Sequence, residues 1–121
     1  MSEHIVKSYD EDLSQLNTML AQMGGLVEQQ LDDAIDALTR RDTALADRVI
    51  QNDDRVDALE HQIEEKAILT IARRQPVARD LRKIMVAIRV ASDLERIGDR
   101  TTNIAEDIVY LASGEVEDLN P

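Results

Sequence analysis

A row of acidic and amide side chains recurs at four-residue intervals in the last third of the chain. Its members are Glu95, Asp99, Asn103 and Asp107. On an α-helix, side chains at this spacing lie next to one another along one ridge. Like charges at this spacing cost roughly 0.2–0.5 kcal/mol per pair, and no basic residue lies three or four positions from Glu95. Glu95 beside Asp99 is therefore unfavourable unless something compensates, and a bound cation would do so.

Three glycines interrupt segments whose pattern is otherwise helical. Gly98 lies between Glu95 and Asp99, and Gly24 and Gly25 lie in the middle of an earlier segment. A glycine inside a helix costs about 1 kcal/mol relative to alanine. Since a domain is stable by only about 5–15 kcal/mol, these glycines are unfavourable unless they let neighbouring helices approach closely.

Three long helices are predicted to position these groups. Apolar residues recur in steps of three and four, the period of a helix, across residues 10–39, 43–74 and 77–113. Asp42 is expected to cap the second helix, Gln75-Pro76 to end it, and Gly114 to form the left-handed C-cap of the third. The short connections make neighbouring helices antiparallel. The predicted fold class is all-α, an up-down-up three-helix bundle forming one domain over residues 1–121.

The predicted core seam is aliphatic except at a few positions. In the second helix it includes the polar Asn52, which could fix the register between helices. The seam consists of Leu13, Leu16, Leu20, Met23, Val27, Leu31, Ala34 and Leu38, then Leu45, Val49, Asn52, Val56, Leu59, Ile63, Ala67 and Ile71, then Leu81, Ile84, Ile88, Ala91, Leu94, Gly98, Thr101, Ala105, Ile108 and Ala112.

Antiparallel packing is expected to bring further polar groups level with Glu95 and Asp99. Counting from the two turns places Asp53 and Asp57 of the second helix there, with residues 28–30 of the first. Carboxylate and amide oxygens suit a hard or borderline cation such as Mg, Mn or Fe. The lack of Cys, and of His at this level, disfavours a closed zinc site. The Glu-x-x-His pairs of ferritin-like di-iron bundles are also missing.

Several of these features also have simpler explanations. Among 25 acidic residues some fall four apart by chance, and Arg96 could form a surface ion pair with Asp99. His61 completes no metal motif, and both it and His4 are expected to be solvated. The basic residues around the second turn could meet an acidic partner or a membrane surface, although a solvated turn is the default; they are Arg73, Arg74, Arg79, Arg82 and Lys83.

The composition excludes several classes of function. The chain of 121 residues has a formal charge of −11 and no Cys, Trp or Phe, and its pI is near 4.5. An acidic chain is a poor nucleic-acid binder, and one without Cys has no disulfide or thiolate site. No segment resembles a signal peptide or a membrane span, so a cytoplasmic protein with no direct membrane insertion is expected. No phosphate loop or nucleophile motif occurs, which predicts that the protein is not an enzyme.

Four segments resemble the PhoU family of phosphate-signalling regulators. The most specific is residues 93–106, Asp-Leu-Glu-Arg-Ile-Gly-Asp-Arg-Thr-Thr-Asn-Ile-Ala-Glu, which is similar to the family signature of two acids four residues apart. Residues 23–31 resemble the first helix of the family and residues 73–82 its helix 2–3 turn. Its second helix is resembled by Asn52-Asp53 followed by Asp57, Leu59-Glu60 and Ile63-Glu64. The resemblance covers nearly the whole chain.

The resemblance implies a metal site in a three-helix bundle that the family usually repeats twice. In the family the acidic pair is associated with transition metals, often in multinuclear clusters. This implicates Glu95 and Asp99 as ligands, with Asn103, Asp53 and Asp57 as weaker candidates. The cofactor would be a divalent or trivalent metal ion: iron, manganese, magnesium or zinc. Because this chain holds one bundle, a homodimer could restore the pair by symmetry.

By the same resemblance the chain would regulate phosphate uptake and phosphate-starvation signalling. It would act as an adaptor between the ATPase of a phosphate ABC transporter and a sensor histidine kinase. One alternative is a structural helical dimerisation module without metal. Another is a metal-dependent hydrolase or redox protein, which would need an open coordination position and a group that transfers protons.

Overall fold

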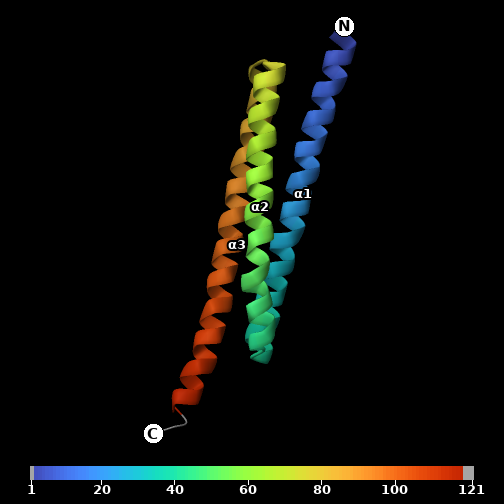
Figure 1. Cartoon of the computed structure of the whole chain (residues 1–121). Coiled ribbons are helices and arrows are strands. Elements are labelled where there is room, and N and C mark those ends of the chain that lie inside the picture. The colour runs from blue at the N-terminus through green and yellow to red at the C-terminus, as the bar shows by residue number, and fades with distance from the viewer. Residues whose placement is uncertain (1, 119–121) are drawn as a thin grey trace.

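Three long helices joined by two short turns run side by side (Figure 1). The structure is a computed structural model that describes the backbone of residues 2–118 and the side chains of residues 8–114. Helix α1 covers Ser2–Arg40, α2 covers Thr43–Arg74 and α3 covers Ala78–Asp118. Successive helices are antiparallel and each contacts the other two. The described backbone holds no strand, so the predicted all-α three-helix bundle is confirmed.

The helix boundaries at the turns follow the predicted local chemistry. The Asp42 carboxylate accepts a hydrogen bond of 3.0 Å from the backbone N–H of Leu45 and caps α2. Gln75 ends α2 in a left-handed conformation, with φ at 45°, directly before Pro76. Both turns therefore form where the sequence places a capping residue and a proline.

The outer ends of α1 and α3 differ from the prediction. Helix α1 begins at Ser2 rather than at residue 10, and α3 continues through Gly114 to Asp118. The expected C-cap at Gly114 is wrong, since no glycine of the described backbone has a positive φ. Glycine permits the left-handed conformation but does not impose it where the chain has no need to turn. Residues 119–121 lie outside the described backbone.

The inward positions of α1 follow a seven-residue repeat. Leu31 and Leu38, predicted to lie in the core, are 37% and 53% exposed, whereas Gln30 and Ala37 are buried. In a left-handed bundle the inward positions alternate in steps of three and four. Three residues after Val27, this alternation places Gln30 inward, whatever its side chain. The apolar side chains of Leu31 and Leu38 therefore did not indicate which positions of α1 face inward.

The same repeat places two carboxylates at inward positions of α2. Asn52 is exposed, so its predicted place in the seam is wrong. Asp53 and Glu60 instead stand on either side of the buried Val56 in the three-four alternation, and both are half-buried. Two acids therefore occupy positions where a bundle normally buries apolar side chains.

Near the α2–α3 turn, α1 is tied to α2 by an ion-pair network around Asp12. Lys66 Nζ and Arg74 Nε donate to its two carboxylate oxygens over 2.9 and 3.0 Å. Burial raises the pKa of Asp12, but the bonds and charges of Lys66 and Arg74 outweigh burial, so the pKa lies below its ordinary value. Lys83 pairs with Asp80 over 3.9 Å. Two of the basic residues at the turn are thus partnered within the chain.

None of the described helices is long and apolar enough to cross a membrane.

Candidate metal centre

A polar layer crosses the bundle, with one inward residue from each helix. Gln30 of α1 is only 4% exposed, Gly98 of α3 is buried, and Asp53 of α2 is half-buried. The Gln30 side chain donates from Nε2 to Asp53 Oδ1 over 3.4 Å. Its carbonyl oxygen, Oε1, is buried without a hydrogen-bond partner among the described residues. The layer therefore contains an oxygen acceptor that the chain itself leaves unsatisfied.

Gly98 makes this close layer possible. A Cβ at this position would lie 3.2 Å from both Asp53 Oδ1 and Gln30 Oε1. The prediction that glycine permits close approach is confirmed at this position. The same prediction is wrong within this chain for Gly24 and Gly25, because a Cβ at either position would have no atom of another helix within 4 Å.

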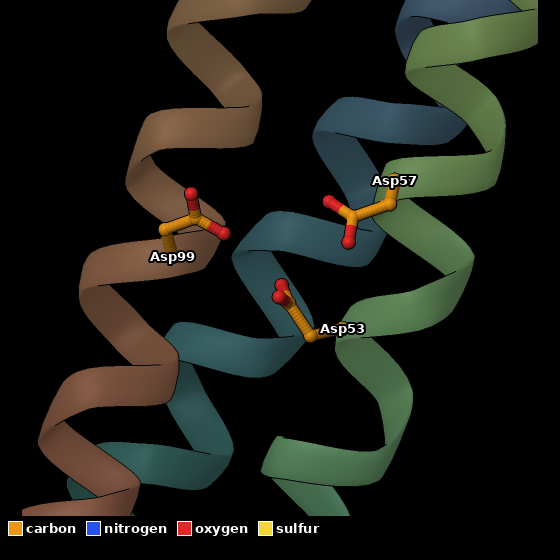
Figure 2. Close-up of side chains that lie close together, drawn as sticks. All are labelled: Asp53, Asp57 and Asp99. Atoms are coloured by element: carbon orange, nitrogen blue, oxygen red, sulfur yellow. The ribbon is translucent and has the colours of Figure 1, made fainter.

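Three aspartates meet beside this layer (Figure 2). Asp53 and Asp57, one turn apart on α2, face Asp99 on α3. One carboxylate oxygen from each lies within 4.8 Å of those of the other two. Asp53 and Asp57 are half-buried and Asp99 is exposed. Because hard cations bind oxygen at about 2.0–2.6 Å, one ion between the helices could contact all three carboxylates.

Glu95 and Glu60 extend this group to five acids, which we call the acidic cluster. A hydrogen bond to Asp99, burial, and the charges of Asp99, Glu60 and Asp57 raise the pKa of Glu95 to about 7. Burial raises the pKa of Glu60, and the charges of Glu64, Asp57 and Asp99 add to it, against an opposing contribution from His61. Near neutral pH Glu95 therefore retains a proton in part of the molecules, which an isolated carboxyl group would release.

The pKa of Asp53 is also raised. Burial raises its pKa, and the charges of Asp57 and Asp99 raise it further, against hydrogen bonds from Gln30 and Thr102. In residues 8–114, no Lys or Arg forms an ion pair with any of the five acids. Arg96, the expected surface partner of Asp99, pairs instead with Asp93 over 4.0 Å. The simpler explanation of Asp99 as half of an ion pair is therefore wrong.

Four of the five predicted ligands lie together: Glu95, Asp99, Asp53 and Asp57. Asn103, one turn beyond Asp99, is exposed, and no hydrogen bond joins it to the acidic cluster in the part of the chain described. Its role as a ligand stays a prediction.

Glu60 was missed by the sequence analysis. The signal that could have found it is its seven-residue distance from Asp53, which gives both residues the same inward direction. His61 is exposed, as expected of a solvated residue. The side chain of His4 lies outside the described residues.

The donor set fits a hard or borderline cation. Asp53, Asp57 and Asp99 offer oxygen ligands, and neither His nor Cys joins them in the described part of the chain. Oxygen-only sites favour Mg, Mn or oxidised Fe over a structural Zn. A cation would also supply the positive charge that the acidic cluster lacks. Asp53, Asp57 and Asp99 are the residues best placed to hold it, with Glu95 and Glu60 one turn away.

Comparison with known proteins identifies the family. Residues 20–108 match the PhoU domain. This chain belongs to the PhoU family. The matched segment contains the acidic cluster and Gln30, so the resemblance inferred from residues 93–106 is confirmed over most of the chain.

Several curated relatives carry the PhoU name. The phosphate-specific transport system accessory protein PhoU homolog of Rhizobium meliloti is 50% identical over 109 residues, which cover 90% of this chain and 46% of the relative. The homolog of Xylella fastidiosa is 44% identical over 110 residues, 91% of this chain and 45% of the relative. The PhoU accessory protein of Escherichia coli is 44% identical over 99 residues, 82% of this chain and 41% of the relative. The chain thus spans about half the length of the curated relatives it matches.

Proposed function

We propose that this PhoU-family chain is a metal-binding regulator of phosphate uptake and phosphate-starvation signalling. Its relatives are named accessory proteins of a phosphate-specific transport system, which supports a role in that system. By family resemblance it would act in the cytoplasm as an adaptor between the ATPase of a phosphate ABC transporter and a sensor histidine kinase. The role is regulatory rather than catalytic, in keeping with the accessory function in the names of the relatives.

The observation that carries the metal role is the acidic cluster without basic partners at inward positions. Asp53 and Glu60 stand in the core repeat of α2, opposite Asp99 and Glu95 of α3. Partly buried like charges are unfavourable unless they are neutralised. A cation held between the helices would remove this repulsion and brace α2 against α3. Metal binding would then add directly to the free energy of unfolding.

The second candidate function is a structural helical module that binds no metal. The raised pKa of Glu95, about 7 beside Asp99, favours it, since a proton shared by two carboxyl groups offsets part of their repulsion without a cation. The two candidates differ in what neutralises the acidic cluster at neutral pH.

Elemental analysis of the purified chain separates the two. We expect Mn, Fe or Mg to accompany the wild-type protein and to be lost in Glu95→Gln/Asp99→Asn. The matched control is Asp93→Asn/Asp107→Asn, which removes the same amount of charge from exposed positions on the same helix. Metal retained by the control and lost by the cluster variant supports the proposal. A wild-type chain that binds no added metal, and whose melting temperature metal leaves unchanged, supports the structural module.

The regulatory part is tested in cells. Deleting the gene should derepress phosphate-starvation genes in phosphate-rich medium, and the wild-type chain should restore repression. Unchanged expression after deletion would refute the regulatory role. Complementation with Glu95→Gln/Asp99→Asn then shows whether regulation depends on the acidic cluster.

A further inference from the structure

Helix α1 buries one amide side chain, that of Gln30, beside the candidate metal centre. In the part of the chain whose side chains are described, the buried polar residues are Gln30, Thr70 and Thr101. Each threonine donates to the backbone carbonyl four residues earlier, over 2.7 and 2.8 Å, which satisfies its buried hydroxyl group. Gln30 instead reaches across to α2, and its carbonyl oxygen Oε1 accepts no hydrogen bond from residues 8–114. Gln30 therefore differs from the two threonines in holding a buried acceptor without a partner.

This oxygen borders the same space as a carboxylate oxygen of Asp53. A Cβ on Gly98 of α3 would lie 3.2 Å from Gln30 Oε1 and 3.2 Å from Asp53 Oδ1. Because Gly98 carries no side chain, α3 leaves this space open to both oxygens. Helix α1 passes behind the three aspartates of the candidate centre (Figure 2). An ion bound to Asp53 on this side would therefore lie next to α1 as well.

The amide of Gln30 can present its oxygen to such an ion. Its Nε2 donates to Asp53 Oδ1 over 3.4 Å, which is longer than the about 2.7–3.2 Å of most N–H···O bonds. The terminal bond of a glutamine side chain rotates easily, and half a turn exchanges the positions of Nε2 and Oε1. Neighbouring oxygen ligands lie about 3 Å apart on a cation that binds oxygen at about 2.1 Å. The amide is thus a weak donor to Asp53 but is suitably placed to add a second oxygen beside it.

We propose that Gln30 Oε1 is a further ligand of the cation that the three aspartates of α2 and α3 would bind, so that the metal joins all three helices. The inference rests on the metal-binding role proposed above and adds to it a neutral ligand from α1. Amide carbonyl oxygens are ordinary ligands of hard cations. Binding the ion would satisfy the buried acceptor, and because the amide is uncharged, it would add no repulsion to the acidic cluster.

Metal affinity tests the assignment. Gln30→Met keeps most of the length and volume of the side chain but removes the oxygen. Loss of even an outer partner of a metal ligand costs about 10–100-fold in affinity, so Gln30→Met should weaken Mn²⁺ binding by at least about tenfold in calorimetric titration. The matched control is Gln29→Met, which alters the exposed neighbouring amide and should bind as the wild type does. Without metal, Gln30→Met should melt no lower than the wild type, because it removes an unsatisfied buried oxygen.

Gln30→Glu distinguishes a ligand from a residue that only positions Asp53. Glutamate keeps an oxygen at this position but lacks the N–H group that donates to Asp53. Its added charge is matched by Gln29→Glu, one residue away on the same helix. If Gln30 is a ligand, Gln30→Glu should bind Mn²⁺ at least as tightly as Gln29→Glu. If Gln30 acts only through Nε2, Gln30→Glu should bind Mn²⁺ more weakly than Gln29→Glu.

The number of water molecules on the bound ion gives a readout that packing alone does not change. Bound Mn²⁺ is paramagnetic, so the ¹⁷O relaxation of the solvent counts the waters that it carries. Where Gln30 occupies one coordination position, Gln30→Met should carry one more water than the wild type. Gln29→Met should carry the same number as the wild type.

The outcomes separate this inference from the proposed function. A wild-type chain that binds no metal would overturn both. A wild-type chain that binds Mn²⁺, with Gln30→Met equal to it in affinity and in the number of bound waters, would overturn the assignment of Gln30 and leave the metal role standing. Affinity lost equally in Gln30→Met and Gln30→Glu, with the water count unchanged, would make Gln30 a positioning residue of Asp53 and refute its role as a ligand.

Discussion

Replacing Gly98 with alanine tests how closely the polar layer is packed. Two effects oppose each other. Alanine is favoured over glycine inside a helix by about 1 kcal/mol. The added Cβ, however, would lie 3.2 Å from Asp53 Oδ1 and Gln30 Oε1 and 3.4 Å from Val56 Cγ1. Since Gln30 and Val56 are buried, these atoms have little room to move.

The expected magnitude follows from the two effects. Overpacking a well-filled site costs typically about 1–3 kcal/mol, which cancels or exceeds the gain in helix propensity. We therefore expect Gly98→Ala to be between unchanged and about 2 kcal/mol less stable than the wild type. Gly25→Ala is the matched control, because Gly25 is exposed and no atom lies within 4 Å of its Cβ position. It should gain about 1 kcal/mol.

Guanidinium unfolding followed by helical circular dichroism measures both variants, with EDTA present so that bound metal does not contribute. The free energy of unfolding of Gly98→Ala should lie about 1–3 kcal/mol below that of Gly25→Ala. Equal stabilisation by the two alanines would refute the close layer. Gly98→Ala should also weaken metal binding, because it displaces the Asp53 carboxylate, whereas Gly25→Ala should not.

Three further predictions concern charges. The pKa of Glu95 is raised from 4.5 to about 7, so the metal-free native state holds a proton that the unfolded chain releases. The stabilisation that this proton gives the native state is complete below pH 4.5 and is lost as the pH rises through 7. Denaturant unfolding in EDTA should show the free energy of unfolding fall from pH 5 to pH 8, and Glu95→Gln should flatten this pH dependence. Asp12→Asn should lower the free energy of unfolding by about 1–3 kcal/mol, because it weakens the bonds to Lys66 and Arg74. Glu60→Leu should raise that free energy by about 1 kcal/mol while it lowers metal affinity, as calorimetric titration would show.

Exposed acids near the altered positions provide the controls. Each control makes the same kind of substitution at an exposed acid: Glu106→Gln for Glu95→Gln, Asp10→Asn for Asp12→Asn, and Glu65→Leu for Glu60→Leu. These controls should leave the free energy of unfolding nearly unchanged. Metal-free stability that does not vary between pH 5 and pH 8 would contradict the reasoning on Glu95. An Asp12→Asn variant as stable as the wild type would contradict the prediction for Asp12. A Glu60→Leu variant less stable than the wild type would contradict the prediction for Glu60.

The number, type and order of the helices could be predicted from the chain because their signals are local. Apolar residues in steps of three and four define each helix, and Asp42 and Pro76 act on the residues next to them. The family could also be inferred, since residues 93–106 carry its signature in a continuous run. Gly114 shows the limit of such local signals, because glycine allows a helix to end without requiring it.

Which residues form the acidic cluster is decided by how the helices pack and could be predicted only in part from the sequence alone. The sequence pattern suggested Asn52, Leu31 and Leu38 as inward residues, whereas the bundle turns Asp53 and Gln30 inward. Residue type is a weak guide there, because the direction of each side chain follows from the supercoil that all three helices share. Likewise, the near meeting of Asp53, Asp57 and Asp99 depends on the axial register of α2 against α3. That register is set by the sum of many side-chain contacts along both helices, which no single segment of the chain contains.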